Sequence, residues 1–387
     1  MIDLLYSEDE DLVRQTVRTM LTDRLVPATL VRAAEDDIAP LRGHLQFRLE
    51  EELGVTRMHL PEELGGGGAT FREVGVVMEE LGRRVAPTPF LGAAVLAPTA
   101  LLTVGADGLL KDLGSEAVHA ALIVPVTTDP TGQFPGSVRL GPDGRLTGRV
   151  GAVVDVVDAA HHIVPALDVD GRPCLLAVAA DDARVRIVEH TSLDLTRPVV
   201  AVEYNAAAVT TTLAGGEVAT AAVRAALVAG AGLLASEQLG IAEYCLDTTV
   251  KYLGERRQFG RIVGSYQALK HRLADLWVEI GGARAVARQA VAMLTEAGPR
   301  MSGYLEQGSV LRQEIDLAVT LAQYQCSAVA VRAAEEAVQL HGGVGMTWEL
   351  PLHLSLKRAK ADQLAFGSAG TRFDRLAELV DLPGPAR

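Results

Sequence analysis

The sequence predicts an α+β protein in which a helical region is followed by a β region and then by a second helical region. Apolar residues recur at helical spacing up to about residue 105, and short runs rich in β-branched residues fill the chain between about 119 and 213. Long segments rich in alanine and leucine then continue to about residue 380. We therefore expect domains at residues 1–114, 115–215 and 216–387.

The composition indicates a globular protein with a large core, because 49% of the 387 residues are hydrophobic and 22% are charged. A formal net charge of -13 argues against a non-specific nucleic-acid binder, which needs a basic face. The first residues lack the pattern of a signal peptide, and no charge-free stretch is long enough to span a membrane. We expect a cytoplasmic protein that has neither nucleic acid nor a membrane as a partner.

Metal binding is not predicted. Cys174, Cys245 and Cys326 are far apart and have no metal-ligand spacing, so we interpret them as buried thiols. His161 and His162 are neighbours in a predicted strand and point to opposite faces, so they cannot readily share a metal ion.

In the N-terminal region, the first helix is expected to begin after Ser7, which is a good N-cap followed by acidic residues that favour a helix N-terminus. Pro61 and the glycine run 65–68 force a loop, after which "FREVGVVMEELGRR" resumes a helical pattern.

In the middle region, runs such as "HHIVPAL", "PCLLAVAA" and "VVAVEYN" alternate with turn signals such as "GPDGR" and "DVDGRP", which predicts a small β domain.

The C-terminal region predicts a bundle of antiparallel helices that is interrupted at "GERRQFGRIVG", "AGPRMSG" and "HGGVGM". Within it, "GAGLLA" at 230–235 looks like a loose dinucleotide fingerprint. No strand precedes it, so we interpret its small residues as a site of close helix packing.

Two of the interruptions are candidate ligand sites. The first carries Arg256, Arg257 and Arg261 beside glycines and suits a phosphate ester, although the spacing is equally compatible with solvated surface arginines. The second, "QLHGGVGMTWE", has glycines that let the backbone approach a ligand closely, although it could also be a simple helix stop.

Three stretches resemble the signature regions of the acyl-CoA dehydrogenase family, in the same order and over nearly the whole chain. They are "HLPEELGGGGATFREVGVVMEELGRR", "ERRQFGRIVGSYQALKHRLADL" and "AVQLHGGVGMTWELPLHLSLKRAK". The resemblance implies an N-terminal helical domain, a middle β domain and a C-terminal four-helix bundle. It also implies an oligomeric FAD enzyme that oxidises an acyl-CoA thioester to the 2,3-enoyl thioester and passes electrons to an acceptor such as an electron-transfer flavoprotein.

The resemblance also assigns cofactor contacts. In the family, the "RxxFG" loop and the "QxxGGxG" segment of one subunit hold the pyrophosphate and adenosine part of the FAD bound to its neighbour. The FAD contacts implied in this sequence are Arg256, Phe259, Gln267, Gln339, Gly342, Gly343 and Thr371.

The catalytic base that the family needs is missing from both of its usual places. That base is a glutamate that takes the C2 proton of the substrate, and the two family positions fall at Ala369 and Gly230. The segment that contacts the flavin ring in the family survives only as 128–130, and the expected flavin strand, "GRVGAVVDVVDAAHHIVPA", has neither Trp nor Thr.

Several hypotheses follow. The chain is the non-catalytic partner in a heteromeric acyl-CoA dehydrogenase, an arrangement known in the family for bulky substrates such as steroid side chains. Alternatively, it is an autonomous dehydrogenase with an unusual base, for which Glu237 is the best candidate because it lies seven residues beyond Gly230 on the same helix face. A flavin monooxygenase or oxidase on the same fold would need no glutamate, and a purely structural protein would need no ligand.

Overall fold

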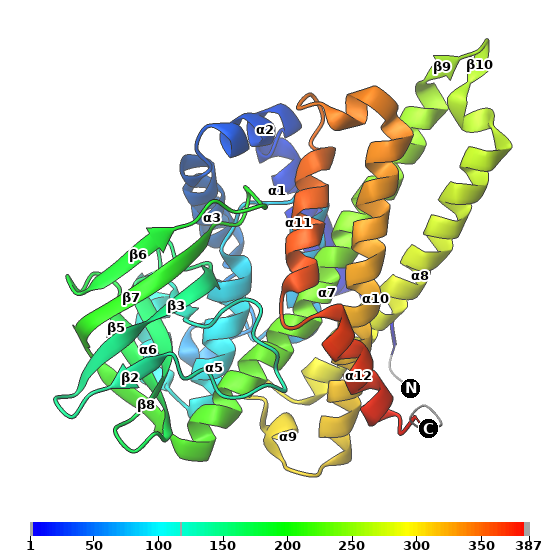
Figure 1. Ribbon diagram of the computed structural model, residues 1–387. Helices are drawn as coiled ribbons and strands as arrows, with labels where there is room; N and C mark the ends of the chain where they lie inside the picture. Colours follow the sequence, from blue (N-terminus) through cyan, green and yellow to red (C-terminus); the bar gives the residue numbers. More distant parts are fainter. Residues whose placement is uncertain (1–2, 117, 383–387) are drawn as a thin grey trace.

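The computed structural model describes residues 3–116 and 118–382, and its elements follow the predicted order (Figure 1). The chain begins with a helical region. The serine N-cap is confirmed, because Ser7 and Glu10 form a reciprocal capping box at the start of the first helix. The helices of this region are α1 (Glu8–Arg24), α2 (Pro27–Glu35), α3 (Ala39–Leu53), η1 (Glu62–Leu64), α4 (Phe71–Arg84), η2 (Leu91–Leu96), α5 (Ala97–Val104) and α6 (Asp107–Glu116).

The middle region is one eight-stranded sheet with the strand order β6-β7-β3-β2-β4-β5-β8, and β1 pairs with β4. Its inner face forms a core of its own, centred on residues such as Val150, Val164 and Leu176. The strands are β1 (Ala120–Leu122), β2 (Val138–Leu140), β3 (Arg145–Val154), β4 (His161–Leu167), β5 (Pro173–Ala179), β6 (Val185–Glu189), β7 (Val199–Ala208) and β8 (Thr211–Gly215). His162 is buried and contacts the hydroxyl of Tyr204 at 3.0 Å, which agrees with a structural role.

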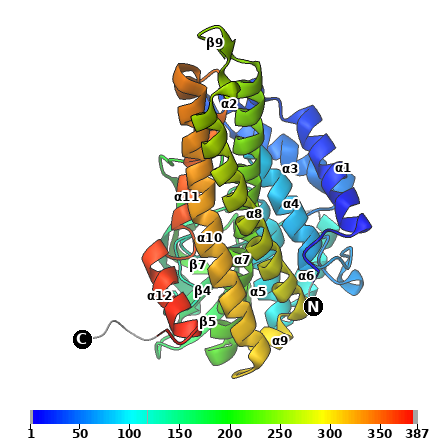
Figure 2. The ribbon, with the colours of Figure 1, turned by 90° about the vertical axis from the view of Figure 1, so that its right-hand side faces the viewer.

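The C-terminal region is a helical bundle around α7, which lies between the sheet and the outer helices α8 and α10 (Figure 2). A hairpin joins α7 to α8 at the end of the bundle that is remote from the sheet (Figure 1). The elements are α7 (Gly216–Glu255), β9 (Arg257–Gln258), β10 (Arg261–Ile262), η3 (Val263–Ser265), α8 (Gln267–Glu296), α9 (Ser302–Leu305), α10 (Val310–His341), η4 (Gly342–Met346), α11 (Leu352–Leu364) and α12 (Ala369–Leu379).

Helix α7 is long and apolar enough to cross a bilayer, but 78% of its most apolar window is buried inside the protein. That burial is what the central helix of a bundle requires. The "GAGLLA" stretch lies within this helix, where Gly232 faces Leu294 and Val319, so its interpretation as a packing site is confirmed.

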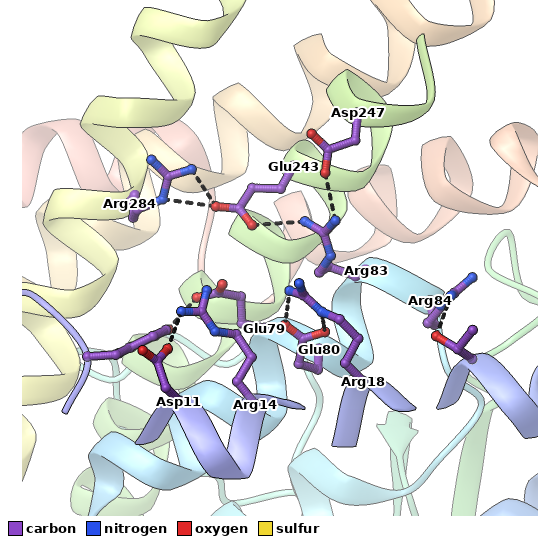
Figure 3. A network of polar contacts seen from close by, with 12 residues as sticks. Asp11, Arg14, Arg18, Glu79, Glu80, Arg83, Arg84, Glu243, Asp247 and Arg284 are labelled. Carbon is purple, nitrogen blue, oxygen red and sulfur yellow. Dashed lines mark hydrogen bonds and ion pairs between the residues drawn. The ribbon is translucent and has the colours of Figure 1, made fainter. Parts of the chain in front are cut away.

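Helices α4 and α7 cross in backbone contact. A Cβ atom at Gly82 would collide with the carbonyl oxygen of Glu237, and one at Gly240 would collide with that of Glu79. Charged side chains surround this crossing, and Glu243 is held between Arg83 and Arg284 (Figure 3). The two glycines therefore fix the position of α7, which carries Gly230 and Glu237.

Candidate functional site

Four of the predicted cofactor residues meet in one cavity at the hairpin end of the bundle. Arg256 ends α7, Gln339 lies in the last turn of α10, and Gly342 and Gly343 follow directly. The cavity has a volume of about 540 Å³. A Cβ atom at either glycine would meet nothing within 4 Å, so the backbone at this place is open to a ligand. The other lining residues are Tyr252, Leu253, Gln258, Val263, Leu269, Arg272, Leu340, His341 and Val344.

This cavity suits a phosphate group. Within the described residues the Arg256 guanidinium has no ion-pair partner, and it is exposed beside the open glycine turn. A guanidinium donates two parallel hydrogen bonds to phosphate oxygens, and an unpaired one can do so without breaking another contact. We name this cavity the phosphate end.

Sequence reasoning missed an aromatic pair at the phosphate end. The rings of Tyr252 and His341 stack with their centroids 4.3 Å apart and their planes at 20°. His341 Nδ1 is 2.7 Å from the carbonyl oxygen of Ala337, and burial lowers the pKa of His341 below its usual value. The signal was present, because Tyr252 lies one helical turn before Arg256 and His341 directly precedes the glycine pair.

Two predicted cofactor residues lie outside the cavity. Phe259, at the hairpin tip, is 90% exposed and has a φ of 53°. Gln267 is exposed at the start of α8 and contacts His271. Arg261 stacks on Tyr266, with its guanidinium 3.6 Å from the ring centre. These side chains are directed outward, where another chain can reach them.

The last predicted cofactor residue, Thr371, lies in a second region, which we name the ring end. It lines a cavity of only about 30 Å³ together with Asp129, Pro130 and Phe366. Two backbone hydrogen bonds join the surrounding segments: Val126 N donates to Ala152 O at 2.7 Å, and Phe366 N donates to Val126 O at 2.8 Å. A cavity needs roughly 10–15 Å³ of such space to hold one water molecule, so the ring end has room for about two water molecules and is far too small for a flavin ring.

Both family positions for a base lie at or beside the ring end. A Cβ atom at Gly230 would stand 2.5 Å from Leu96 Cδ2 and 2.8 Å from Phe366 Cζ, so two apolar side chains fill the space that a glutamate would need. Ala369 is exposed as the first residue of α12. The Thr371 hydroxyl donates to Ser368 O at 2.9 Å within the helix cap.

The candidate base Glu237 lies in an environment that disfavours a role as a base. Its carboxylate accepts hydrogen bonds from Arg197 at 2.7 Å and from Arg358 at 2.6 Å, and only 1% of the residue is exposed. Burial opposes its ionisation, but the two guanidinium groups outweigh burial and hold the pKa of Glu237 below its usual value. A carboxylate bound on both oxygens and shielded from solvent is not free to take a proton from a substrate.

The same charges form a buried network between the sheet and the bundle. Arg358 also pairs with Asp194, and Arg197 pairs with Asp362 at 3.0 Å. Burial and the neighbouring Glu237 raise the pKa of Asp362 well above its usual value, while Arg197 and Arg358 oppose that shift. Glu237 therefore has a structural role in joining the two regions.

The three-part fold is shared with solved acyl-CoA dehydrogenases. The ChsE4-ChsE5 complex from Mycobacterium tuberculosis has a TM-score of 0.82 and 26% identity, covering 99% of this chain and 100% of that chain. A Tcur3481-Tcur3483 steroid ACAD variant has a TM-score of 0.78 and 26% identity, covering 97% and 98%. Butyryl-CoA dehydrogenase from Megasphaera elsdenii, at 20% identity and a TM-score of 0.81, covers 98% and 100% and shows the common fold.

Sequence comparison gives the family. The family models for "Acyl-CoA dehydrogenase, N-terminal domain" and "Acyl-CoA dehydrogenase, C-terminal domain" match residues 7–126 and 220–380. Acyl-CoA dehydrogenase IpdE2 of Mycolicibacterium smegmatis is 33% identical over 370 residues, which are 96% of this chain and 98% of that protein. The chain therefore belongs to the acyl-CoA dehydrogenase family of flavoprotein oxidoreductases, and the predicted family and fold are confirmed.

Proposed function

We propose that this chain is the non-catalytic subunit of a heteromeric acyl-CoA dehydrogenase that oxidises an acyl-CoA thioester at its α,β bond. The observation that carries the proposal is the contrast between two separate regions: the phosphate end, which would serve the FAD of a neighbouring subunit, and the ring end, which would serve an FAD of this chain. The phosphate end is open and holds an unpaired Arg256, whereas Leu96 and Phe366 fill the ring end beside Gly230.

The reaction requires groups that this chain does not present. A base must take the C2 proton, and FAD, when bound, supplies the acceptor for the C3 hydride. Neither Gly230 nor Ala369 carries a carboxylate, and Glu237 is bound by two arginines. The base and the flavin-ring contacts therefore come from a partner subunit in this account.

The phosphate end fits the pyrophosphate and adenosine part of FAD. Arg256 can neutralise phosphate charge, and Gly342 and Gly343 leave room for the backbone to approach it. The ring end does not fit an isoalloxazine ring, because only about 30 Å³ is open there. These two observations support the proposal that this chain completes the FAD site of a neighbouring subunit and has no complete FAD site of its own.

The relatives add support. Two solved structures of similar fold are described as the ChsE4-ChsE5 complex and as a Tcur3481-Tcur3483 steroid ACAD, so assemblies of two different chains occur among proteins similar to this one. By this similarity we propose a related dehydrogenase subunit as the partner and a bulky acyl-CoA thioester, such as a steroid derivative, as the substrate.

The test is turnover of a panel of acyl-CoA thioesters with an artificial electron acceptor. We expect no measurable turnover by this chain alone and restored turnover after co-expression with a related subunit that carries the glutamate. A matched complex in which that glutamate is replaced by glutamine controls for assembly without the base and is expected to lose about 10²- to 10⁴-fold in rate. Ordinary turnover by this chain alone would refute the proposal.

A further inference from the structure

The loop between α11 and α12 is held in an unfavourable conformation. Phe366 has a φ of 55°, in the left-handed region that bulky residues rarely adopt, and only 1% of it is exposed. The next residue, Gly367, has a φ of 106°. Such a conformation persists only where the surrounding contacts impose it.

Arg372 supplies two of those contacts. Its guanidinium donates hydrogen bonds to the carbonyl oxygens of Ala365 at 2.5 Å and of Gly367 at 2.8 Å. The side-chain amide of Gln323 donates to Ala365 O at 3.2 Å, and Phe366 N donates to Val126 O at 2.8 Å. The loop is thus fixed from α12, from α10 and from the sheet domain.

Arg372 itself is an unusual buried cation. Only 3% of it is exposed, and its remaining side-chain partner is the hydroxyl of Ser327 at 3.1 Å. Within the described residues it forms no ion pair with a carboxylate. A buried charge is normally paired, so a guanidinium that binds mainly loop carbonyls points to a role in fixing the loop.

The side chain held in this way reaches the empty base position. The Phe366 ring and the Leu96 side chain both approach the position that a Cβ atom would take at Gly230. The loop therefore occupies the ring end with a residue of the chain itself, and this residue precedes α12, whose first turn carries Arg372.

We propose that residues 365–367 form a plug, that Phe366 fills the ring end, and that Arg372 is the latch that holds the plug in place. This inference rests on the proposed function and adds how the unused half of the site is kept closed. It predicts that the two ends bind independently. The phosphate end accepts an adenosine diphosphate, and the ring end accepts a free isoalloxazine ring only after the plug is removed.

The test uses separate probes for the two ends. Lumiflavin, which has the ring without phosphate, is titrated by fluorescence quenching against the wild type and against Phe366→Ala, with Phe366→Leu as a control that keeps the space filled. We expect no saturable quenching for the wild type or Phe366→Leu and at least a tenfold gain in affinity for Phe366→Ala. ADP binding, which reports on the phosphate end and hence on the proposed function, is expected to stay unchanged in all three proteins.

The latch is tested by hydrogen exchange in Arg372→Gln, which retains the wild-type Phe366. We expect the amides of the 365–367 loop to exchange at least tenfold faster, while the amides of α7 keep their protection. Lumiflavin binding by the wild type as tight as by Phe366→Ala, or unchanged loop exchange in Arg372→Gln, would overturn the plug. Loss of ADP binding in an Arg256→Ala variant would at the same time show that the phosphate end is intact in the wild type.

Discussion

The ring of Phe366 occupies the space that a side chain at Gly230 would need, with its Cζ atom 2.8 Å from the Cβ position of residue 230. Gly230→Glu would restore a carboxylate that the family uses, but it would place the charge among Leu96 and Phe366 without a partner. We expect this substitution to lower the free energy of unfolding by more than about 3 kcal/mol and to give no turnover. Urea denaturation measures the first effect. Gly230→Ala is the steric control and should cost about 1–3 kcal/mol; a stable, active Gly230→Glu protein would contradict the packing described here.

The second empty base position gives the opposite expectation for stability. Ala369 is exposed in the first turn of α12, so Ala369→Glu places a negative charge at a helix N-terminus without crowding. We expect it to raise the free energy of unfolding by about 0.3–1 kcal/mol and to leave the chain inactive, because the ring end remains closed. Thermal unfolding and thioester turnover check both parts. A gain of activity from this single change would show that only the carboxylate was missing.

Replacing Glu237 separates a structural carboxylate from a catalytic one. Glu237→Gln leaves Arg197 and Arg358 buried without their shared partner, so we expect a loss of about 3–5 kcal/mol in the free energy of unfolding. The control is Glu335→Gln, which breaks the exposed pair with Lys360 and should cost less than about 1 kcal/mol. Equal, small effects from the two substitutions would argue against the buried network.

The stability of the protein should depend on pH through Glu79, at the crossing of α4 and α7 (Figure 3). Burial, with the nearby Glu243 adding to it, raises the pKa of Glu79 to about 7, and its carboxylate contacts the Tyr6 hydroxyl at 2.5 Å. The folded protein binds the proton of Glu79 more tightly than the unfolded chain does. The stabilisation that comes from protonated Glu79 is therefore fully present below about pH 4.5 and is lost as the pH rises through about 7.

Glu79→Gln should remove that dependence and stabilise the protein at pH 8 relative to the wild type, by on the order of 3 kcal/mol at most. Unfolding curves of both proteins at pH 5 and pH 8 make the comparison, and the difference between the proteins should shrink at pH 5. A difference that is the same at both pH values would show that Glu79 does not titrate in this range.

Much of the fold could be predicted from the sequence because its signals are local. The capping residue Ser7, the glycine run at 65–68 and the helix that follows each depend on neighbours within a few positions. The phosphate end was equally accessible, since Arg256 and the pair Gly342 and Gly343 stand in two compact motifs.

The closure of the ring end could not be predicted in the same way. It brings Leu96, Val126, Gly230 and Phe366 together from four distant segments, and no local pattern reports such a contact. The surroundings of Glu237 could not be predicted for the same reason. Helical spacing relates Glu237 to Gly230, but its partners Arg197 and Arg358 lie 40 and 121 residues away in the sequence.

We propose that this chain contributes the phosphate end of a shared site and has no open ring end of its own. The most direct measurement is the amount of FAD per chain in the complex with a related, glutamate-bearing subunit, for the wild type, Arg256→Ala and the neighbouring control Arg257→Ala, whose side chain does not line the cavity. We expect about one flavin per pair of chains, a clear loss in Arg256→Ala and no loss in Arg257→Ala. Two flavins per pair, or full retention in Arg256→Ala, would contradict it.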